Sequence, residues 1–174
     1  MSTTKRVKPN ILITGTPGTG KTSLSEILSN THDFKHVDIS ALVKEKELHD
    51  GWDDEFQCYI LDEDKVCDEL EETMNQGGII VDHHGCEWFP ERWFDLVIVL
   101  RTDTKILNER LKKRNYNTVK IENNIDCEIY QMILEEAKNS YKHEIVKELQ
   151  STTIEDNEHN QQIIGEWINS WNKQ

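Results

Sequence analysis

The sequence predicts a three-layer α/β fold built on a mostly parallel sheet. Three apolar runs, at 11–13, 79–81 and 96–100, contain no polar residue, which is typical of strands buried on both faces. Segments with helical spacing of apolar residues separate these runs, and strands that alternate with helices favour a sheet covered by helices on both faces. Ligands of such folds lie at the carboxyl ends of the strands.

The first half of the chain is expected to hold three of the strands. In order, the pattern predicts a strand at 10–15, a helix at 20–30, a strand at 34–39, a helix from the capping residue Ser40 to about Leu48, an acidic and aromatic loop at 49–60, a helix at 62–76 and a strand at 79–82. Gly77 and Gly78 end the helix before the last of these strands.

The second half continues the alternation. The pattern predicts an irregular stretch at 83–92, a strand at 96–100, a helix at 103–113 that Asp103 caps, a polar basic stretch at 114–124 and a long helix at 126–143. Residues 144–151 fit either a last strand or a continuation of the helix to Leu149. A polar link at 151–160 and an amphipathic helix at 161–173 close the chain, with an apolar stripe of Ile163, Ile164, Trp167, Ile168 and Trp171.

Composition limits the class of protein. The 174 residues suit one domain, 1–174, and no apolar run reaches the length of a membrane span. The N-terminal stretch has no apolar signal-peptide core, so we expect the protein to stay inside the cell. Four scattered cysteines favour reduced thiols over a zinc site or disulfides. A net charge of −13 weighs against a general grip on nucleic acid and suits either a basic protein partner or simple solubility.

A phosphate-binding loop follows the first strand. The stretch GTPGTGKT, from Gly15 to Thr22, matches G-x-x-x-x-G-K-[ST] in full and opens a helix, as the mechanism requires. Glycines let backbone N–H groups surround a phosphate, and the helix N-terminus attracts the same anion. Lys21 can reach the β- and γ-phosphates of a nucleotide, and Thr22 can offer its hydroxyl to Mg²⁺. A glycine-rich turn with a chance lysine is the simpler alternative, which the full match in this context disfavours.

Asp82 and His84 follow the strand at 79–82. A carboxylate at the carboxyl end of a strand beside a phosphate loop can hold Mg²⁺ or its water shell. His84 could polarise a water molecule or organise that shell. The alternatives are an aspartate in a surface turn and a histidine that only fixes a loop.

A late cluster of basic residues indicates a closing lid. Phosphoryl transfer needs positive charge near the migrating group, and a short basic segment after a helix can supply it. A solvated run of charges is the ordinary alternative. The residues are Arg110, Lys112, Lys113, Arg114 and Lys120.

Together these motifs resemble the adenylate kinase isoenzyme 6 family, a group of small adenylate-kinase-like P-loop NTPases also described as coilin-interacting nuclear ATPases. The resemblance covers nearly the whole chain and is weakest after about residue 150. It rests on GTPGTGKT, on HDGWDDEF followed by ILDEDKV, on GGIIVDHHGCEWFPERWF, on VLRTDT and on ERLKKRNY.

The resemblance implies a P-loop NTPase three-layer fold: a five-stranded parallel sheet, helices on both faces, a monophosphate-binding region at 38–61 and a short lid at 113–123. It implies Mg²⁺ held through Thr22 and Asp82, and catalysis by Lys21, Asp82, His84 and Arg114. The nucleotide-binding residues that it implies are Gly15, Gly18, Gly20, Lys21, Thr22, Ser23 and Arg114.

The same resemblance implies a function. ATP and AMP would be the substrates of an Mg²⁺-dependent phosphotransferase that also hydrolyses ATP. It also implies a role in small ribosomal subunit maturation, a partner of the uS11 ribosomal protein type, and residence in nucleus and cytoplasm. Two positions depart from the family pattern: Lys44 stands where an arginine is frequent, and Arg114-Asn115 replaces the usual Arg-Gly. The rival functions are an ATP-driven assembly factor with incidental kinase activity and a kinase for another small metabolite.

Overall fold

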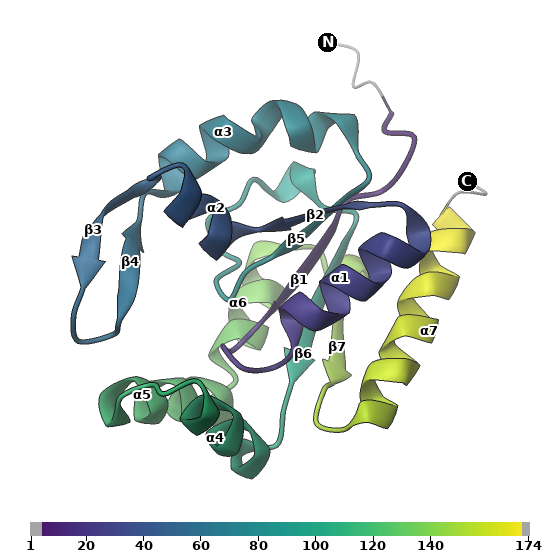
Figure 1. Ribbon diagram of the computed structural model, residues 1–174. Coiled ribbons are helices and arrows are strands. Elements are labelled where there is room, and N and C mark those ends of the chain that lie inside the picture. The colour runs from purple at the N-terminus through teal and green to yellow at the C-terminus, as the bar shows by residue number, and fades with distance from the viewer. Residues whose placement is uncertain (1–4, 172–174) are drawn as a thin grey trace.

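Five parallel strands form the central sheet in the order β2-β5-β1-β6-β7 (Figure 1). The computed structural model describes residues 5–171. The strands are β1 (Ile11–Gly15), β2 (Lys35–Asp38), β5 (Ile79–Asp82), β6 (Leu96–Arg101) and β7 (Val146–Gln150), and a separate antiparallel hairpin consists of β3 (His49–Asp53) and β4 (Cys58–Leu61).

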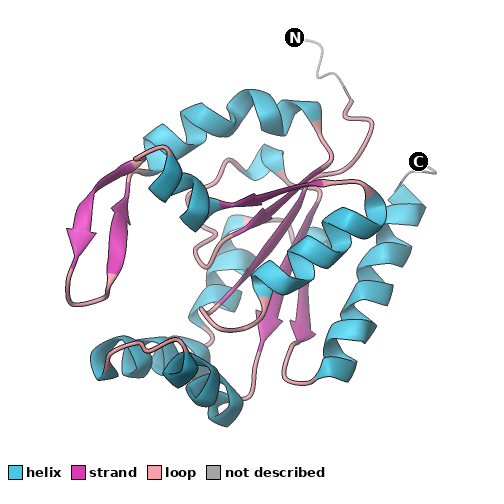
Figure 2. Cartoon of the chain, viewed as in Figure 1, coloured by secondary structure: helices cyan, strands magenta, loops and turns pink. Residues whose placement is uncertain are grey.

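Helices cover both faces of this sheet (Figure 2). Because side chains alternate along a strand, Leu12, Val81 and Val97 pack with one group of helices, whereas Ile11, Ile80 and Ile98 pack with the other. The first group is α2 (Ile39–Glu45), α3 (Glu63–Gln76) and α6 (Met132–Ser140), and the second is α1 (Lys21–His32) and α7 (Ile154–Trp171). The three-layer α/β fold expected from the sequence is therefore confirmed.

The remaining helices lie beyond the carboxyl ends of the strands. They are α4 (Thr104–Lys113) and α5 (Thr118–Ile129), whereas short 3₁₀ turns at Glu91–Trp93 and His143–Ile145 precede the amino ends of β6 and β7. Figure 1 shows α4 and α5 side by side below the sheet, with the hairpin across from them. No helix within the described part of the chain combines the length and the apolar character that crossing a membrane requires.

The expectation for residues 34–60 is wrong in two places. Asp38, at the end of β2, caps α2 in place of Ser40, because its carboxylate accepts a hydrogen bond from the backbone N–H of Ala41 at 3.1 Å. The expected loop at 49–60 is a hairpin. Tyr59 stacks on His49 with ring centroids 4.3 Å apart and meets Trp52 edge-on, and these cross-strand pairs stabilise two short strands rich in acidic and aromatic residues.

The expected long helix at 126–143 is two helices. Gln131 has a φ of 56° and breaks the chain between α5 and α6. α5 itself begins inside the polar basic stretch at 114–124, ahead of the expected start at 126, because the side chain of Asn117 caps it by accepting a hydrogen bond from the N–H of Lys120 at 2.8 Å.

The end of the chain also differs from the expectation. Of the two alternatives for 144–151, the structure has the strand, β7, which pairs with β6. The expected polar link is mostly helix, because α7 begins at Ile154 and not at 161. Thr153 and Asp156 cap it reciprocally, with hydrogen bonds of 3.0 Å in each direction. The expected end of this helix at 173, like the first four residues of the N-terminal stretch, lies outside the described residues.

Candidate active site

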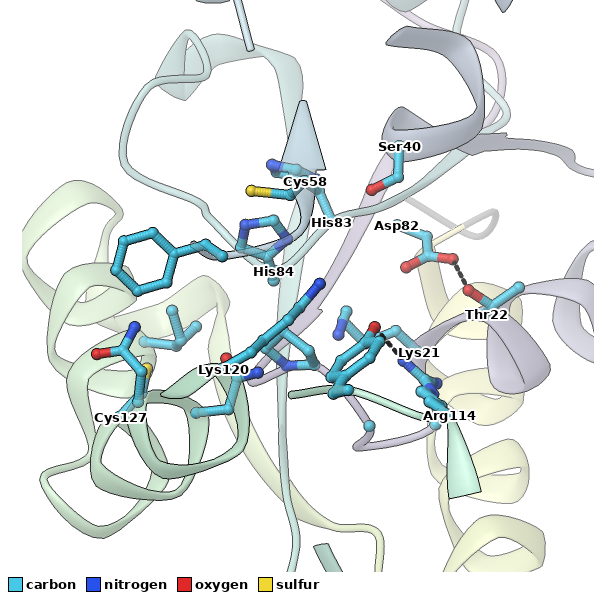
Figure 3. Close-up of a pocket in the computed structure, with 18 of the residues that line it drawn as sticks. Lys21, Thr22, Ser40, Cys58, Asp82, His83, His84, Arg114, Lys120 and Cys127 are labelled. Atoms are coloured by element: carbon cyan, nitrogen blue, oxygen red, sulfur yellow. Dashed lines mark hydrogen bonds between the residues drawn. The ribbon is translucent and has the colours of Figure 1, made fainter. Parts of the chain in front are cut away.

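A cavity of about 580 Å³ lies at the carboxyl ends of β1, β2 and β5, where the sequence placed its candidates (Figure 3). The phosphate loop forms one wall, β2 and the hairpin form another, and the segment from Arg114 through α5 forms a third. The predicted site residues that line it are Gly18, Gly20, Lys21, Thr22, Ser23, Asp82, His84 and Arg114. The topology thus brings together residues that lie almost a hundred positions apart.

Gly15 and Gly18 shape the loop by close packing. A side chain on Gly15, whose φ is +147°, would place its Cβ 2.7 Å from the carbonyl oxygen of Leu100. At Gly18, with φ +93°, the Cβ would lie 2.9 Å from Cδ1 of Leu107. Gly15 does not line the cavity, so its part is to seat the loop against β6.

The N-terminus of α1 opens toward the cavity. Its N-cap, Gly20, has no side chain to accept a hydrogen bond. The backbone N–H groups of the first turn, which holds Lys21, Thr22 and Ser23, therefore have no side-chain cap. Free N–H groups together with the helix dipole form an anion site.

Lys21 adds a positive charge to the anion site. Its Nζ donates to the backbone oxygen of Thr16 at 3.1 Å, which holds the side chain along the loop. Burial is the main cause that lowers the pKa of Lys21 to about 8, with Asp82 opposing the shift and Arg114 adding to it. An anion bound here would therefore favour the charged form of Lys21.

Thr22, the last residue of the loop, meets Asp82 at the end of β5. The Thr22 hydroxyl donates to Oδ2 of Asp82 at 2.6 Å, and Nε2 of His36 lies 3.2 Å from the same oxygen. A hydroxyl and a carboxylate side by side are the hard oxygen donors that Mg²⁺ prefers, so these two residues fit that ion. Among residues 5–171, no group of three or more histidine, cysteine, aspartate or glutamate side chains could hold a metal on its own.

Two histidines follow Asp82. His84 faces the open space of the cavity, and its backbone oxygen accepts a hydrogen bond from Thr14 at 3.1 Å. The enclosing walls, then the charges of Lys21 and Lys120, lower the pKa of His84 to about 4. His83 is buried, and its ring centroid lies 4.2 Å from that of His84.

The basic cluster divides between two environments. Arg114 and Lys120 line the cavity, and Asn115 between them adopts a φ of 58°, which is the left-handed turn that glycine provides in the family pattern. Arg110 instead donates to the backbone oxygens of Gly18 and Ser151, at 3.1 and 3.0 Å, and to that of Thr152. Arg110 therefore holds the phosphate loop against the segment after β7.

The hairpin and α5 touch across the mouth of the cavity. The backbone N–H of Asn117 donates to Oε1 of Gln57 at 3.2 Å, and its side-chain amide donates to the oxygen of Glu55 at 3.1 Å. Nζ of Lys120 donates to the oxygen of Gln57 at 3.1 Å and lies 3.9 Å above the ring of Tyr116. The basic segment thus closes over the cavity through exposed polar contacts.

Several cavity residues were not among the sequence candidates. Some lie in the hairpin and the start of α5, which the sequence pattern did not predict as strand or helix, and others lie in expected elements without a motif to single them out. They are Asp38, Ser40, Phe56, Cys58, His83, Tyr116, Asn123, Asn124, Asp126, Cys127, Met132 and Ile133. Lys44 is exposed in the last turn of α2 and does not line the cavity.

Comparison with known proteins shows the family of the chain. A family model described as an AAA domain matches residues 11–131. A protein of Dictyostelium discoideum named adenylate kinase isoenzyme 6 homolog is 73% identical over 167 residues, which cover 96% of this chain and 95% of that protein. The chain belongs to the adenylate kinase isoenzyme 6 family. A homolog of that family from Drosophila melanogaster is 47% identical over 167 residues, with the same 96% and 95% coverage.

A solved structure confirms the fold alone. Shikimate kinase from Bacteroides thetaiotaomicron aligns with a TM-score of 0.62 over 92% of this chain and 98% of that one, at 15% identity. The P-loop NTPase fold with a five-stranded parallel sheet, expected from the resemblance to the adenylate kinase isoenzyme 6 family, is thus confirmed.

Proposed function

We propose that the protein is an Mg²⁺-dependent ATP:AMP phosphotransferase that also transfers the γ-phosphoryl group of ATP, more slowly, to water. One observation carries the proposal: a single cavity joins a phosphate loop and its Thr22–Asp82 pair to a basic lid and to a separate wall from β2 and the hairpin. Two separate walls around one phosphate site suit a donor and an acceptor nucleotide. The name of the adenylate kinase isoenzyme 6 relatives supports the choice of substrates.

Phosphoryl transfer by this site depends on positioning and charge. The N–H groups at the start of α1 and the Nζ of Lys21 bind the phosphates of ATP, and Arg114 approaches them from the lid. Mg²⁺ held at Thr22 and Asp82 would neutralise phosphate charge. The lid excludes water while the acceptor phosphate attacks, so no side-chain nucleophile is needed. ATP and AMP then leave as two molecules of ADP.

His84 has the position of a water-organising residue. Its side chain reaches the cavity two residues beyond Asp82, and its lowered pKa of about 4 keeps the imidazole neutral at pH 7. A neutral imidazole can accept a proton or a hydrogen bond from water. We propose that His84 supports the slower hydrolysis when water takes the place of AMP.

The test is to follow ADP formed from ATP with and without AMP. We expect about two ADP per ATP when AMP is present, slow hydrolysis without it, and loss of both reactions in Lys21→Ala. A panel of other nucleoside monophosphates and small alcohols separates this proposal from a kinase for another metabolite. Faster transfer to any member of that panel than to AMP would contradict it.

A second candidate is an ATP-driven assembly factor with incidental kinase activity. The observation in its favour is the hairpin, whose acidic residues Asp50, Asp54 and Glu55 are exposed beside the exposed apolar side chains of Trp52 and Ile60. With a net charge of −13, this surface suits a basic protein. We propose a ribosomal protein of the uS11 type as that partner, small ribosomal subunit maturation as the process, and nucleus and cytoplasm as its location.

Adding a uS11-type protein to the ATPase assay separates the two candidates. Stimulated hydrolysis with a fall in transfer to AMP would favour the assembly factor. Hydrolysis that the partner leaves unchanged would favour the phosphotransferase, and imaging of the tagged chain would test its residence in nucleus and cytoplasm.

A further inference from the structure

His83 is a buried polar side chain that the proposed mechanism does not use. It follows β5 directly, and its backbone N–H donates to the oxygen of Ile13 at 3.2 Å, which extends the pairing with β1 by one residue. The residue is 6% exposed and its side chain lines the cavity. Its Nδ1 is buried without a hydrogen-bond partner among the described residues. A buried ring nitrogen without a hydrogen-bond partner costs free energy unless a ligand supplies the missing hydrogen bond.

The alternation of β5 separates His83 from the phosphate site. Val81 packs with α2, α3 and α6, so the next side chain, Asp82, points to the opposite face, where it meets Thr22 of α1. His83 returns to the first face. In Figure 3, His83 accordingly lies apart from Thr22, with Asp82 between the two.

The packing of His83 fixes the plane of its ring but not its hydrogen bonding. Trp88 and Phe89 meet the ring edge-on, with centroids 5.6 and 6.2 Å away, and the ring of His84 lies tilted against it with its centroid 4.2 Å away. Within the described part of the chain, no hydrogen bond decides which way the ring is turned about its Cβ–Cγ bond, a half-turn of which exchanges Nδ1 with Cδ2. A hydrogen bond to a ligand can therefore decide which of the two ring orientations His83 adopts.

The surroundings of His83 suit the base of a nucleotide better than its phosphate. Ile133, near the start of α6, lines the cavity and packs in the same apolar cluster as Val81, and Met132 beside it also lines the cavity, so both offer apolar contact. Asn124 lines the same cavity, and its buried Nδ2 is likewise without a partner. An apolar wall with a few unpaired polar groups is the usual setting for recognition of an uncharged ring.

We propose that His83 is a specificity-determining residue of the acceptor subsite, where its imidazole accepts a hydrogen bond from the exocyclic amino group of the acceptor base. This inference rests on the proposed function. It assigns ATP to the α1 face of the sheet and the acceptor nucleoside to the face of α2, α3 and α6.

The test compares AMP with purine riboside 5′-monophosphate, which lacks the amino group. In His83→Phe, which keeps a ring but no nitrogen, we expect the KM for AMP to rise roughly tenfold while the KM values for ATP and for the analogue stay the same. His83→Gln, which retains an acceptor, should restore most of the preference for AMP. Trp88→Phe is the matched control, because it loosens the same packing without touching the cavity, and it should leave the preference unchanged.

The outcomes are distinct. Equal changes of KM for AMP and for the analogue in His83→Phe would overturn the assignment, as would a fall in melting temperature with an unchanged ratio of the two KM values. Should His83→Phe fail to fold, His83→Leu is measured in its place against the same criteria. If the unaltered protein transfers nothing to AMP, the proposed function itself has failed. Normal transfer with an unchanged preference in the variant rejects only the role of His83.

Discussion

The phosphate loop and the mouth of the cavity are built from different kinds of contact. The loop lies against β6 and α4, with buried hydrogen bonds such as those from Thr19 to Thr16 and from Ser151 to Thr19, at 2.8 and 2.6 Å. The mouth is closed by exposed polar contacts between Gln57 and α5. Exposed polar contacts are weak and exchange readily with water, whereas buried ones are costly to break. The loop is therefore the fixed part of the site and the mouth the part that can open.

Lys21→Ala should have the largest effect, because no other side chain places a cation within the loop. We expect turnover of ATP, with or without AMP, to fall by about 1,000-fold, with little change in melting temperature. The steady-state rate of ADP formation measures it. The matched control is Lys105→Ala, an exposed lysine of α4 outside the cavity, which should keep its rate. Near-normal turnover in Lys21→Ala would contradict the assignment of the nucleotide to this loop.

Gly15→Ala and Gly51→Ala compare the two regions by stability. The new Cβ at Gly15 would clash with the backbone oxygen of Leu100, so we expect a loss of about 3 kcal/mol in the free energy of unfolding. Gly51 of the hairpin has a φ of +120° but no atom within 4 Å of the new Cβ, and the expected loss is about 1 kcal/mol. Urea unfolding measures both. Equal losses would show that the loop is no more tightly seated than the hairpin.

Arg114→Ala tests the charge that the lid contributes. Arg114 is exposed at the end of α4, and within residues 5–171 its side chain hydrogen-bonds to Tyr116 alone, at 3.5 Å, so its loss should leave stability unchanged. We expect kcat to fall about 100-fold with little change in the KM for ATP, because the charge acts mainly in the transition state. Arg110→Ala, which breaks the bonds to Gly18 and Ser151, should instead lower the melting temperature. A parallel loss of ATP affinity in Arg114→Ala would indicate ground-state binding.

His84→Gly should be milder, since the loop still neutralises the phosphates. We expect ATP hydrolysis to fall roughly tenfold while the Kd for ATP stays nearly constant. If His84 also couples the site to a protein partner, partner-stimulated hydrolysis should fall further than the basal rate. Melting temperature and hydrolysis are measured on the same variant. A lower melting temperature with unchanged turnover would leave His84 only the role of fixing a loop.

Gln57→Gly should have the smallest effect. It removes the Oε1 that accepts from Asn117 but suits the φ of 50° at this position, so the hairpin turn is kept. We expect about a threefold rise in the KM for AMP and no measurable loss of stability. Initial rates across AMP concentrations provide the measurement. A rise in the KM for ATP alone would indicate that the mouth of the cavity covers the ATP site and not the AMP site.

Short-range patterns were enough to predict much of the fold and part of the site. The apolar runs at β1, β5 and β6, the phosphate loop and Asp82 at the end of a strand could all be located from residue type and spacing. The helix break at Gln131 and the hairpin at 49–61 could not, because a left-handed residue and cross-strand stacking between His49 and Tyr59 have no strong local signature.

The sequence by itself determined the alternation of strands and helices and the chemistry of the loop, since both depend on neighbours along the chain. Tertiary structure alone decided which charges serve the cavity. Arg110 and Arg114 lie one helical turn apart, yet only Arg114 lines the cavity, because the segment after β7 supplies backbone oxygens that bind Arg110. It also decided that His83 lines the same cavity as Ile133, because α6 brings Ile133 there only when it packs against the sheet. Contacts between residues far apart in sequence carry no periodic signal, so only the folded chain reveals them.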